Sequence, residues 1–205
     1  MTEPTERQDK PPRGQATLDG FATQPAVDRL FFAVHPDAQA AQQIGALAQT
    51  LHAKHGLRGK PLPADRLHIT LHHLGDYGGL PESLIEAANA AAARMAMPPF
   101  EVRFDRVASF AGGARKRPCV LRSEAPDANP ALIALQAGLG AHLRDAGLGT
   151  HVERRFTPHV TLLYAERGIT EAVVPPIAWI VRGFALVHSL LGRGQHRILR
   201  AWPLE

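Results

Sequence analysis

The chain has 205 residues, of which 45% are hydrophobic and 20% charged, and it carries a net charge of +4 with a pI near 9.7. This composition excludes a wholly disordered or membrane-embedded protein, and the positive balance favours an anionic partner. A single cysteine, Cys119, excludes an intramolecular disulfide and favours a reducing compartment such as the cytoplasm.

The chain begins with a polar segment rich in proline, glutamine and threonine, and we predict a disordered leader over residues 1–26. This segment has no apolar core, so it does not resemble a secretory signal peptide. The longest apolar stretch, residues 177–191, is interrupted by Arg182, Gly183 and His188 and cannot span a bilayer. We therefore expect a soluble cytoplasmic protein with no membrane partner, folded as one domain over residues 27–205.

The folded region begins with a buried strand over residues 30–34, followed by a helix that starts at Pro36 and ends before Gly56. The apolar face of this helix carries Ile44, Leu47 and Leu51. The segment "RLHITLHHLGD", residues 66–76, is predicted to be the next strand, because turn residues close it.

Pro81 begins a second predicted helix, and residues 100–110 and 118–124 form a predicted hairpin with period-two alternation. Asn129 and Pro130 suit the cap and first turn of a third helix. The remaining predicted strands cover residues 156–164, 179–191 and 195–204. Because strands and helices do not alternate regularly, we predict an α+β fold of two lobes, each an antiparallel sheet with flanking helices, rather than a doubly wound parallel sheet.

A His-x-Thr motif occurs twice, each time inside a strand-like hydrophobic run. The copies are His68-Ile69-Thr70 and His159-Val160-Thr161. In an extended strand, residues i and i+2 point to the same face, about 6.5–7 Å apart. If the two strands face each other, they form a pocket with two imidazoles and two hydroxyl donors, which suits a phosphate.

These side chains can perform acid–base chemistry on a phosphodiester. The pKa of histidine near 6.5 lets one ring take a proton from water while the other protonates the leaving alkoxide. The threonines would stabilise the non-bridging oxygens. The scheme needs no metal or cofactor, and the chain lacks a phosphate-binding Gly-rich loop and a His-Glu-x-x-His helix.

Other polar residues leave alternatives open. In a regular strand His72 shares a face with His68 and Thr70, which favours a supporting phosphate or ribose contact, whereas His73 points the other way. A metal site formed by His68 and His72 is a sharper alternative, but no third ligand has matching spacing. The basic segment 115–117 either steers an RNA backbone or forms a solvated hairpin tip.

The segments "LHITLHHLGD" and "FTPHVTLLY" resemble the two signatures of the two-histidine phosphoesterases. Within that superfamily they are most similar to the bacterial RNA 2′,3′-cyclic phosphodiesterases, also called 2′-5′ RNA ligases (LigT-like). The opening "RLFFAVHPD" and the closing "LVHSLLG" and "WPL" also resemble this family, so the resemblance covers about residues 28–204.

The resemblance implies a bilobal fold with pseudo-two-fold symmetry and an active cleft between the lobes. It implies metal-independent opening of a terminal 2′,3′-cyclic phosphate on RNA or a nucleotide to a 2′-phosphomonoester, and 2′-5′ RNA ligation in the reverse direction. It identifies His68 and His159 as the catalytic pair and Thr70 and Thr161 as the phosphate-binding hydroxyls. As a hypothesis, His68 protonates the leaving 3′-oxygen and His159 activates water. We expect the protein to act as a monomer.

One position departs from the family pattern, because Tyr164 stands where many relatives have an arginine. Strict alternation places Tyr164 on the face opposite His159, so it would need a bulge or a strand end to reach the cleft as a substrate-binding residue. Packing at the rim is the alternative.

Two other functions compete with this interpretation: a non-catalytic RNA-end binding module and a metal-dependent hydrolase. Intact histidines in both motifs argue against the binding module.

Overall fold

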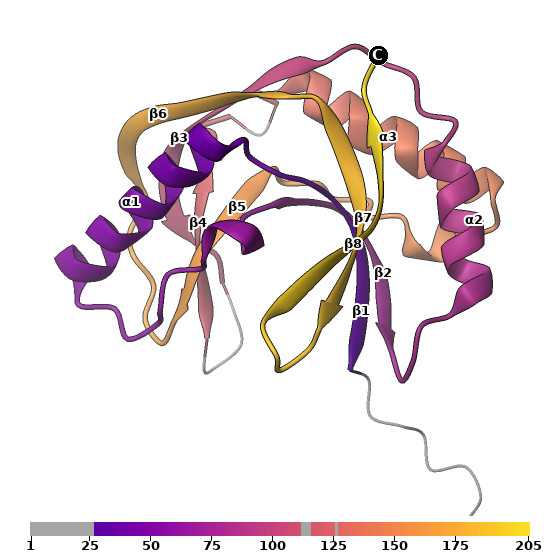
Figure 1. Ribbon diagram of the computed structural model, residues 1–205. Coiled ribbons are helices and arrows are strands. Elements are labelled where there is room, and N and C mark those ends of the chain that lie inside the picture. The colour runs from indigo at the N-terminus through magenta and orange to yellow at the C-terminus, as the bar shows by residue number, and fades with distance from the viewer. Residues whose placement is uncertain (1–26, 112–115, 126) are drawn as a thin grey trace, which may run out of the picture.

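The computed structural model describes residues 27–111, 116–125 and 127–205, so the predicted leader over residues 1–26 and Arg115 lie outside it. The described chain forms two four-stranded antiparallel sheets and three α-helices, which confirms the predicted α+β class (Figure 1). Within these residues, no helix combines the length and the apolar character that a membrane crossing requires.

Each sheet carries one His-x-Thr strand at its edge. The first sheet has the strand order β2 (Ile69–Tyr77), β1 (Asp28–Val34), β7 (Gly183–Leu190) and β8 (Gln195–Pro203). The second sheet has the strand order β5 (His159–Ala165), β4 (Arg117–Arg122), β3 (Phe100–Ser109) and β6 (Ala172–Val181). Because β2 and β5 occupy equivalent edges and contact each other, the two motifs face one another.

The helices are placed by ordinary capping and packing. The helix α1 (Ala38–His55) begins where the Asp37 carboxylate accepts a 2.8 Å hydrogen bond from the Ala40 amide, and it ends at Gly56, whose φ of 55° is left-handed. This agrees with the helix predicted before Gly56. The other elements are α2 (Glu82–Ala92), α3 (Pro130–Asp145) and the short 3₁₀ turns η1 (Ala64–Arg66) and η2 (Gly149–His151).

The two lobes share their helices. The helix α1 follows a strand of the first sheet but packs against β5 and β6 of the second sheet (Figure 1). The helix α3 leaves the second sheet and packs against β2 as well as β3, with α2 beside it. One continuous apolar core therefore extends through both lobes.

The single strand predicted over residues 179–191 is wrong. The chain leaves the second sheet after Val181 and enters the first sheet at Gly183, so the segment is two strands in different sheets. The turn requires glycine, because a Cβ at Gly183 would lie 2.6 Å from the Trp202 carbonyl oxygen. The apolar pattern continues across the turn because Trp179 and Phe184 both enter the core.

Asn129 occupies the N-cap position of α3, immediately before Pro130, as predicted, but its side chain makes no hydrogen bond to the helix amides. Its carboxamide oxygen accepts a hydrogen bond from the Arg103 amide at 2.8 Å, and its nitrogen donates to Ser123 Oγ at 2.7 Å. The side chain therefore ties the start of α3 to the sheet instead of binding the amides of the helix.

Candidate active site

A cleft of about 530 Å³ between the two lobes contains both His-x-Thr motifs. Of the six site residues expected from the sequence, five line this cleft: His68, Thr70, His159, Thr161 and Tyr164. The sixth, His72, does not. The other polar or aromatic side chains in the cleft wall are Arg29, Phe31, Arg66, His73, Ser189 and His196.

The two imidazoles are held in the same way. Nδ1 of His68 lies 2.7 Å from the Arg66 carbonyl oxygen, and Nδ1 of His159 lies 2.7 Å from the Thr157 carbonyl oxygen. Because a carbonyl only accepts, each Nδ1 carries the proton and donates it. In the neutral ring, Nε2 therefore keeps a free lone pair, which can accept a proton from a molecule in the cleft.

The surroundings of the two rings lower their pKa values. Burial lowers the pKa of His68 to about 4, and the neighbouring His196 and His35 add to the effect, with ring centroids 5.2 Å and 6.3 Å away. Burial also lowers the pKa of His159, whose neighbour at 4.9 Å is Phe110. Both rings are therefore neutral near pH 7 in the free protein.

One extra residue in each motif strand decides which side chains reach the cleft. Thr70 pairs with Ala33 and His72 with Phe32, so Leu71 is a bulge. In the second sheet Thr161 pairs with Val120 and Leu163 with Cys119, so Leu162 is the equivalent bulge. The bulge returns Tyr164 to the cleft side, where it is 46% exposed.

The expectation that His72 shares a face with His68 is therefore wrong. After the bulge at Leu71 the His72 ring is fully buried against α3. Its Nε2 donates to the Gln136 carbonyl at 2.8 Å and its Nδ1 accepts from the Glu153 amide at 3.1 Å. Both nitrogens are occupied by the protein, so the ring joins β2 to the segment before β5 and cannot form a metal pair with His68.

The same bulge brings His73, which was expected to point away, to the cleft. Its Nε2 lies 3.1 Å from the Asp76 carboxylate, which also accepts two 2.7 Å hydrogen bonds from Arg29. The hydrogen bonds from Arg29 lower the pKa of Asp76 to about 2. Arg29 and Asp76 thus largely neutralise each other at this end of the cleft.

Arg66 supplies a less compensated positive charge. Within the residues that the structure describes, its Nε is buried without a hydrogen-bond partner while the side chain lines the cleft. The guanidinium group lines the cleft, where its charge can balance that of a phosphate. Sequence reasoning missed Arg66 and His196, although a cation two residues before the first motif histidine is a local signal for the former.

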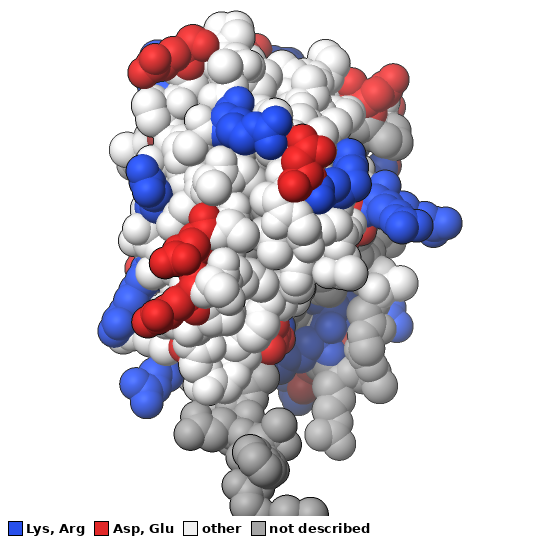
Figure 2. Space-filling view, turned by 90° about the vertical axis from the view of Figure 1, so that its right-hand side faces the viewer, with Lys and Arg blue, Asp and Glu red and all other residues white. Residues whose placement is uncertain are grey.

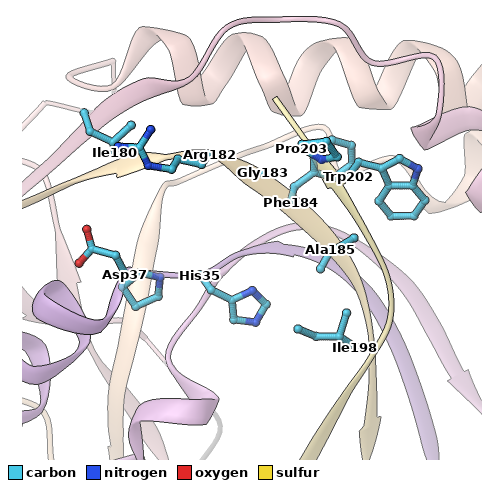
Figure 3. Close-up of a pocket in the computed structure, with 12 residues that line it drawn as sticks. His35, Asp37, Ile180, Arg182, Gly183, Phe184, Ala185, Ile198, Trp202 and Pro203 are labelled. Carbon is cyan, nitrogen blue, oxygen red and sulfur yellow. The ribbon is translucent and has the colours of Figure 1, made fainter. Parts of the chain in front are cut away.

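A second hollow of similar size lies between β6, β7, β8 and the β1–α1 connection (Figure 3). Its volume is about 520 Å³, and its walls include Phe184, Ala185, Ile198 and Trp202. Volume therefore does not separate the two hollows, but chemistry does. Among the described residues that line them, paired imidazoles and hydroxyls occur in the motif cleft alone. In the described part of the chain, no group of three or more His, Cys, Asp or Glu side chains is arranged to hold a metal ion.

The fold and the site together define a two-lobed protein in which a duplicated His-x-Thr strand meets its counterpart across one cleft. A family model described as the 2′-5′ RNA ligase superfamily matches residues 35–193. The chain belongs to this superfamily.

Two relatives match most of the chain. The RNA 2′,3′-cyclic phosphodiesterase of Escherichia coli K12 is 32% identical over 183 residues, covering 86% of this chain and 96% of the relative. The protein of the same name from Thermus thermophilus is 32% identical over 172 residues, covering 80% of this chain and 82% of the relative.

Solved structures agree with the fold. Escherichia coli LigT complexed with 3′-AMP superposes with a TM-score of 0.66 at 30% identity, covering 87% of this chain and 98% of LigT. The TT0787 protein of Thermus thermophilus gives a TM-score of 0.67 at 26% identity, covering 86% of this chain and 97% of that protein.

Proposed function

We propose that the protein hydrolyses terminal 2′,3′-cyclic phosphates on RNA or nucleotides to 2′-phosphomonoesters, with His68 and His159 as the acid–base pair. The observation that carries the proposal is the matched pair of rings in one cleft, each anchored through Nδ1 at 2.7 Å and each keeping a free Nε2 lone pair. The names of the two relatives, both RNA 2′,3′-cyclic phosphodiesterases, support the same reaction.

The reaction requires two proton transfers. His159 takes a proton from the attacking water, whose oxygen bonds to phosphorus, and the bond between phosphorus and the 3′-oxygen breaks. His68 donates its proton to that 3′-oxygen. Since the pKa of His68 is about 4 in the free protein, the negative charge of the bound phosphate must raise the pKa for His68 to arrive protonated.

The charge that develops on the phosphate has partners in the same cleft. The hydroxyls of Thr70 and Thr161 donate to the two non-bridging oxygens, and Arg66 balances the negative charge. The chain's own side chains therefore account for every step, and the scheme calls for no metal ion or cofactor.

The proposal extends to ligation and to the setting in which the protein works. When an RNA 5′-hydroxyl replaces the water, the same steps form a 2′-5′ linkage. All proposed catalytic groups come from one chain, which supports action as a monomer. Cys119 is a free, buried thiol whose pKa burial raises to about 11, which suits the reducing cytoplasm.

The test is hydrolysis of a nucleoside 2′,3′-cyclic phosphate and of a cyclic-phosphate-ended oligonucleotide in excess EDTA. We expect full activity for the native protein, and a loss of about 10²-fold or more for His68→Ala and for His159→Ala. The matched control is His55→Ala, which removes an exposed histidine at the end of α1. Tight RNA-end binding without turnover by the native protein would instead establish a non-catalytic binding module, and inactivation by EDTA would establish a metal-dependent hydrolase.

A further inference from the structure

The motif cleft continues into a groove at Tyr164. Tyr164 also lines an adjoining hollow of about 330 Å³, and a third hollow of about 490 Å³ shares Arg58 and Glu166 with that one. We call the two outer hollows the basic groove, because their walls carry four cationic side chains: Arg58, Lys60, Lys116 and Arg167.

Backbone contacts hold one wall of the basic groove in place. The connection between α1 and η1 (Figure 1) docks on the edge of β5, where Pro61 forms a bridge with Leu163 and the Leu62 amide donates to the Leu162 carbonyl at 2.8 Å. Gly59 makes the approach feasible, because a Cβ there would lie 1.7 Å from the Tyr164 carbonyl oxygen.

This docking places Arg58 and Lys60 beside Tyr164, one residue on either side of Gly59. Lys116, the residue immediately before β4, lines the same hollow. It belongs to the basic segment 115–117 that the sequence singled out. The chain thus brings cations from two distant segments to the mouth of the cleft, next to the second motif.

The groove has one dominant sign of charge. Among the described residues that line it, Glu166 is the single carboxylate, and its 3.8 Å contact with Arg58 joins two highly exposed side chains and so is weak. Arg167 is held in place by hydrogen bonds to the carbonyls of His55 and Gly56 at 3.0 Å and 3.3 Å.

The opposite lobe does not share the groove's excess of positive charge. On the face that carries α2 and α3, basic and acidic side chains lie side by side (Figure 2). Arg94, for example, lies 3.3 Å from Asp145 there. A uniform positive charge is therefore not a property of the whole surface.

We propose that the basic groove binds the ribose-phosphate backbone of the RNA strand whose cyclic end occupies the cleft, with the Tyr164 ring stacking on a base at the junction. The proposal rests on the proposed function and narrows its substrate class. A single nucleotide fills the cleft alone, whereas an oligoribonucleotide also places regularly spaced phosphates along Arg58, Lys60 and Lys116. The preferred substrate is therefore an RNA strand rather than a free nucleotide.

The experiment compares kcat/KM for a nucleoside 2′,3′-cyclic phosphate with kcat/KM for cyclic-phosphate-ended oligoribonucleotides of two, four and eight nucleotides, at several salt concentrations. For the native protein we expect kcat/KM to rise about tenfold or more with length, and the gain to shrink as salt increases. For Lys60→Glu combined with Lys116→Glu, we expect the mononucleotide value to stay within about twofold and the gain with length to disappear.

The matched control is Arg103→Glu combined with Arg182→Glu, which makes the same charge change at exposed positions outside the groove and should behave like the native protein. Three outcomes would refute RNA binding in the groove. The native protein could show no preference for longer substrates, the groove variant could lose equal activity on the mononucleotide and the oligonucleotides, or the control variant could lose as much as the groove variant. If the native protein hydrolyses neither substrate, the proposed function fails. In that case, fluorescence anisotropy of a labelled oligoribonucleotide that ends in a 3′-phosphate still tests whether the groove binds RNA. The proposal then requires that the groove variant binds this oligoribonucleotide more weakly than the native protein and that the control variant does not.

Discussion

The two halves of the cleft share one geometry. In each, a histidine binds the carbonyl two residues before it, a threonine follows at the second position, and a bulged leucine comes next. The fifth residue after each histidine, His73 in one half and Tyr164 in the other, returns to the cleft. Two stretches of sequence that lie far apart in the chain thus present the same pair of functional groups.

Their environments differ. His68 stacks on Phe31 at 4.9 Å and has two histidine neighbours, whereas His159 has the Phe110 ring. The position after the bulge is the hydrogen-bonded His72 in the first half and the apolar Leu163 in the second. The same backbone geometry therefore positions both rings, while His196 and His35 help to lower the pKa of His68 and have no counterpart beside His159.

The largest expected effect is loss of either ring. We expect His68→Gln and His159→Gln each to lower kcat on the cyclic phosphate by about 10³-fold, because each ring moves a proton in the reaction. Bis(p-nitrophenyl) phosphate separates their roles, since its leaving group needs no proton. His68→Gln should lose much less activity on this diester than His159→Gln, and the reverse order would exchange acid and base.

The pH dependence follows from the lowered pKa values of both rings. One ring must be neutral and the other protonated, and kcat/KM reports their titration in the free protein. With the pKa of His68 near 4 and that of His159 below 6.5, kcat/KM should form a bell with both limbs below about pH 6.5. Above the upper limb it should fall about tenfold per pH unit as the protonated ring is lost. An alkaline limb near pH 9 would contradict the prediction.

The threonines should have equal effects in the two halves if they bind equivalent oxygens. We expect Thr70→Val and Thr161→Val each to lower kcat by about 10–100-fold, since each removes one donor to the charged phosphate. Thr70→Ser and Thr161→Ser keep the hydroxyl and should retain most of the activity. A tenfold difference between the two valine variants would show that the phosphate lies closer to one half.

Replacing His72 by leucine, which is the residue at the equivalent position 163 of the other half, tests stability rather than catalysis. His72→Leu leaves the Gln136 carbonyl and the Glu153 amide without their partner, so we expect the free energy of unfolding to fall by about 2 kcal/mol. Urea denaturation measures this loss. Leu163→Met is the control at the equivalent position and should cost less than about 1.5 kcal/mol. Unchanged stability of His72→Leu would refute the structural role.

The smallest effects are expected at His73 and Tyr164, the fifth residues after the two motif histidines. Tyr164→Ala should raise KM for a cyclic-phosphate-ended oligonucleotide about fivefold, because a base loses its stacking partner, while Tyr164→Phe keeps KM near the native value. His73→Ala should raise KM less, because Asp76 holds that ring at 3.1 Å. A large fall in kcat for Tyr164→Phe would instead assign a proton-transfer or phosphate-binding role to the hydroxyl.

The sequence predicts those parts of the molecule that depend on local pattern. The helix between Asp37 and Gly56 and the two His-x-Thr strands follow from capping residues and hydrophobic periodicity. Strict alternation fails at Leu71 and Leu162, because a bulge depends on pairing with a neighbouring strand that no local pattern reveals. Those two inserted residues reverse the predicted positions of His72 and Tyr164.

Other features depend on contacts between distant segments. Arg66 and His196 reach the cleft only through the packing of η1 and β8 around the motif strands. The crossing between the sheets at Gly183 cannot be predicted from the sequence either, because apolar residues on both sides of it enter the same core.

The exchange of helices between the lobes has a consequence for how the protein can be divided. A fragment ending at residue 97 would contain β1, β2 and α1 but lack β7 and β8, and it would leave the apolar side of α1 without β5 and β6. Neither half of the polypeptide is therefore a self-sufficient building block, although each carries one motif. The same interlacing ties the two lobes together through α1 and α3, so the fold itself positions the two imidazoles before any substrate arrives.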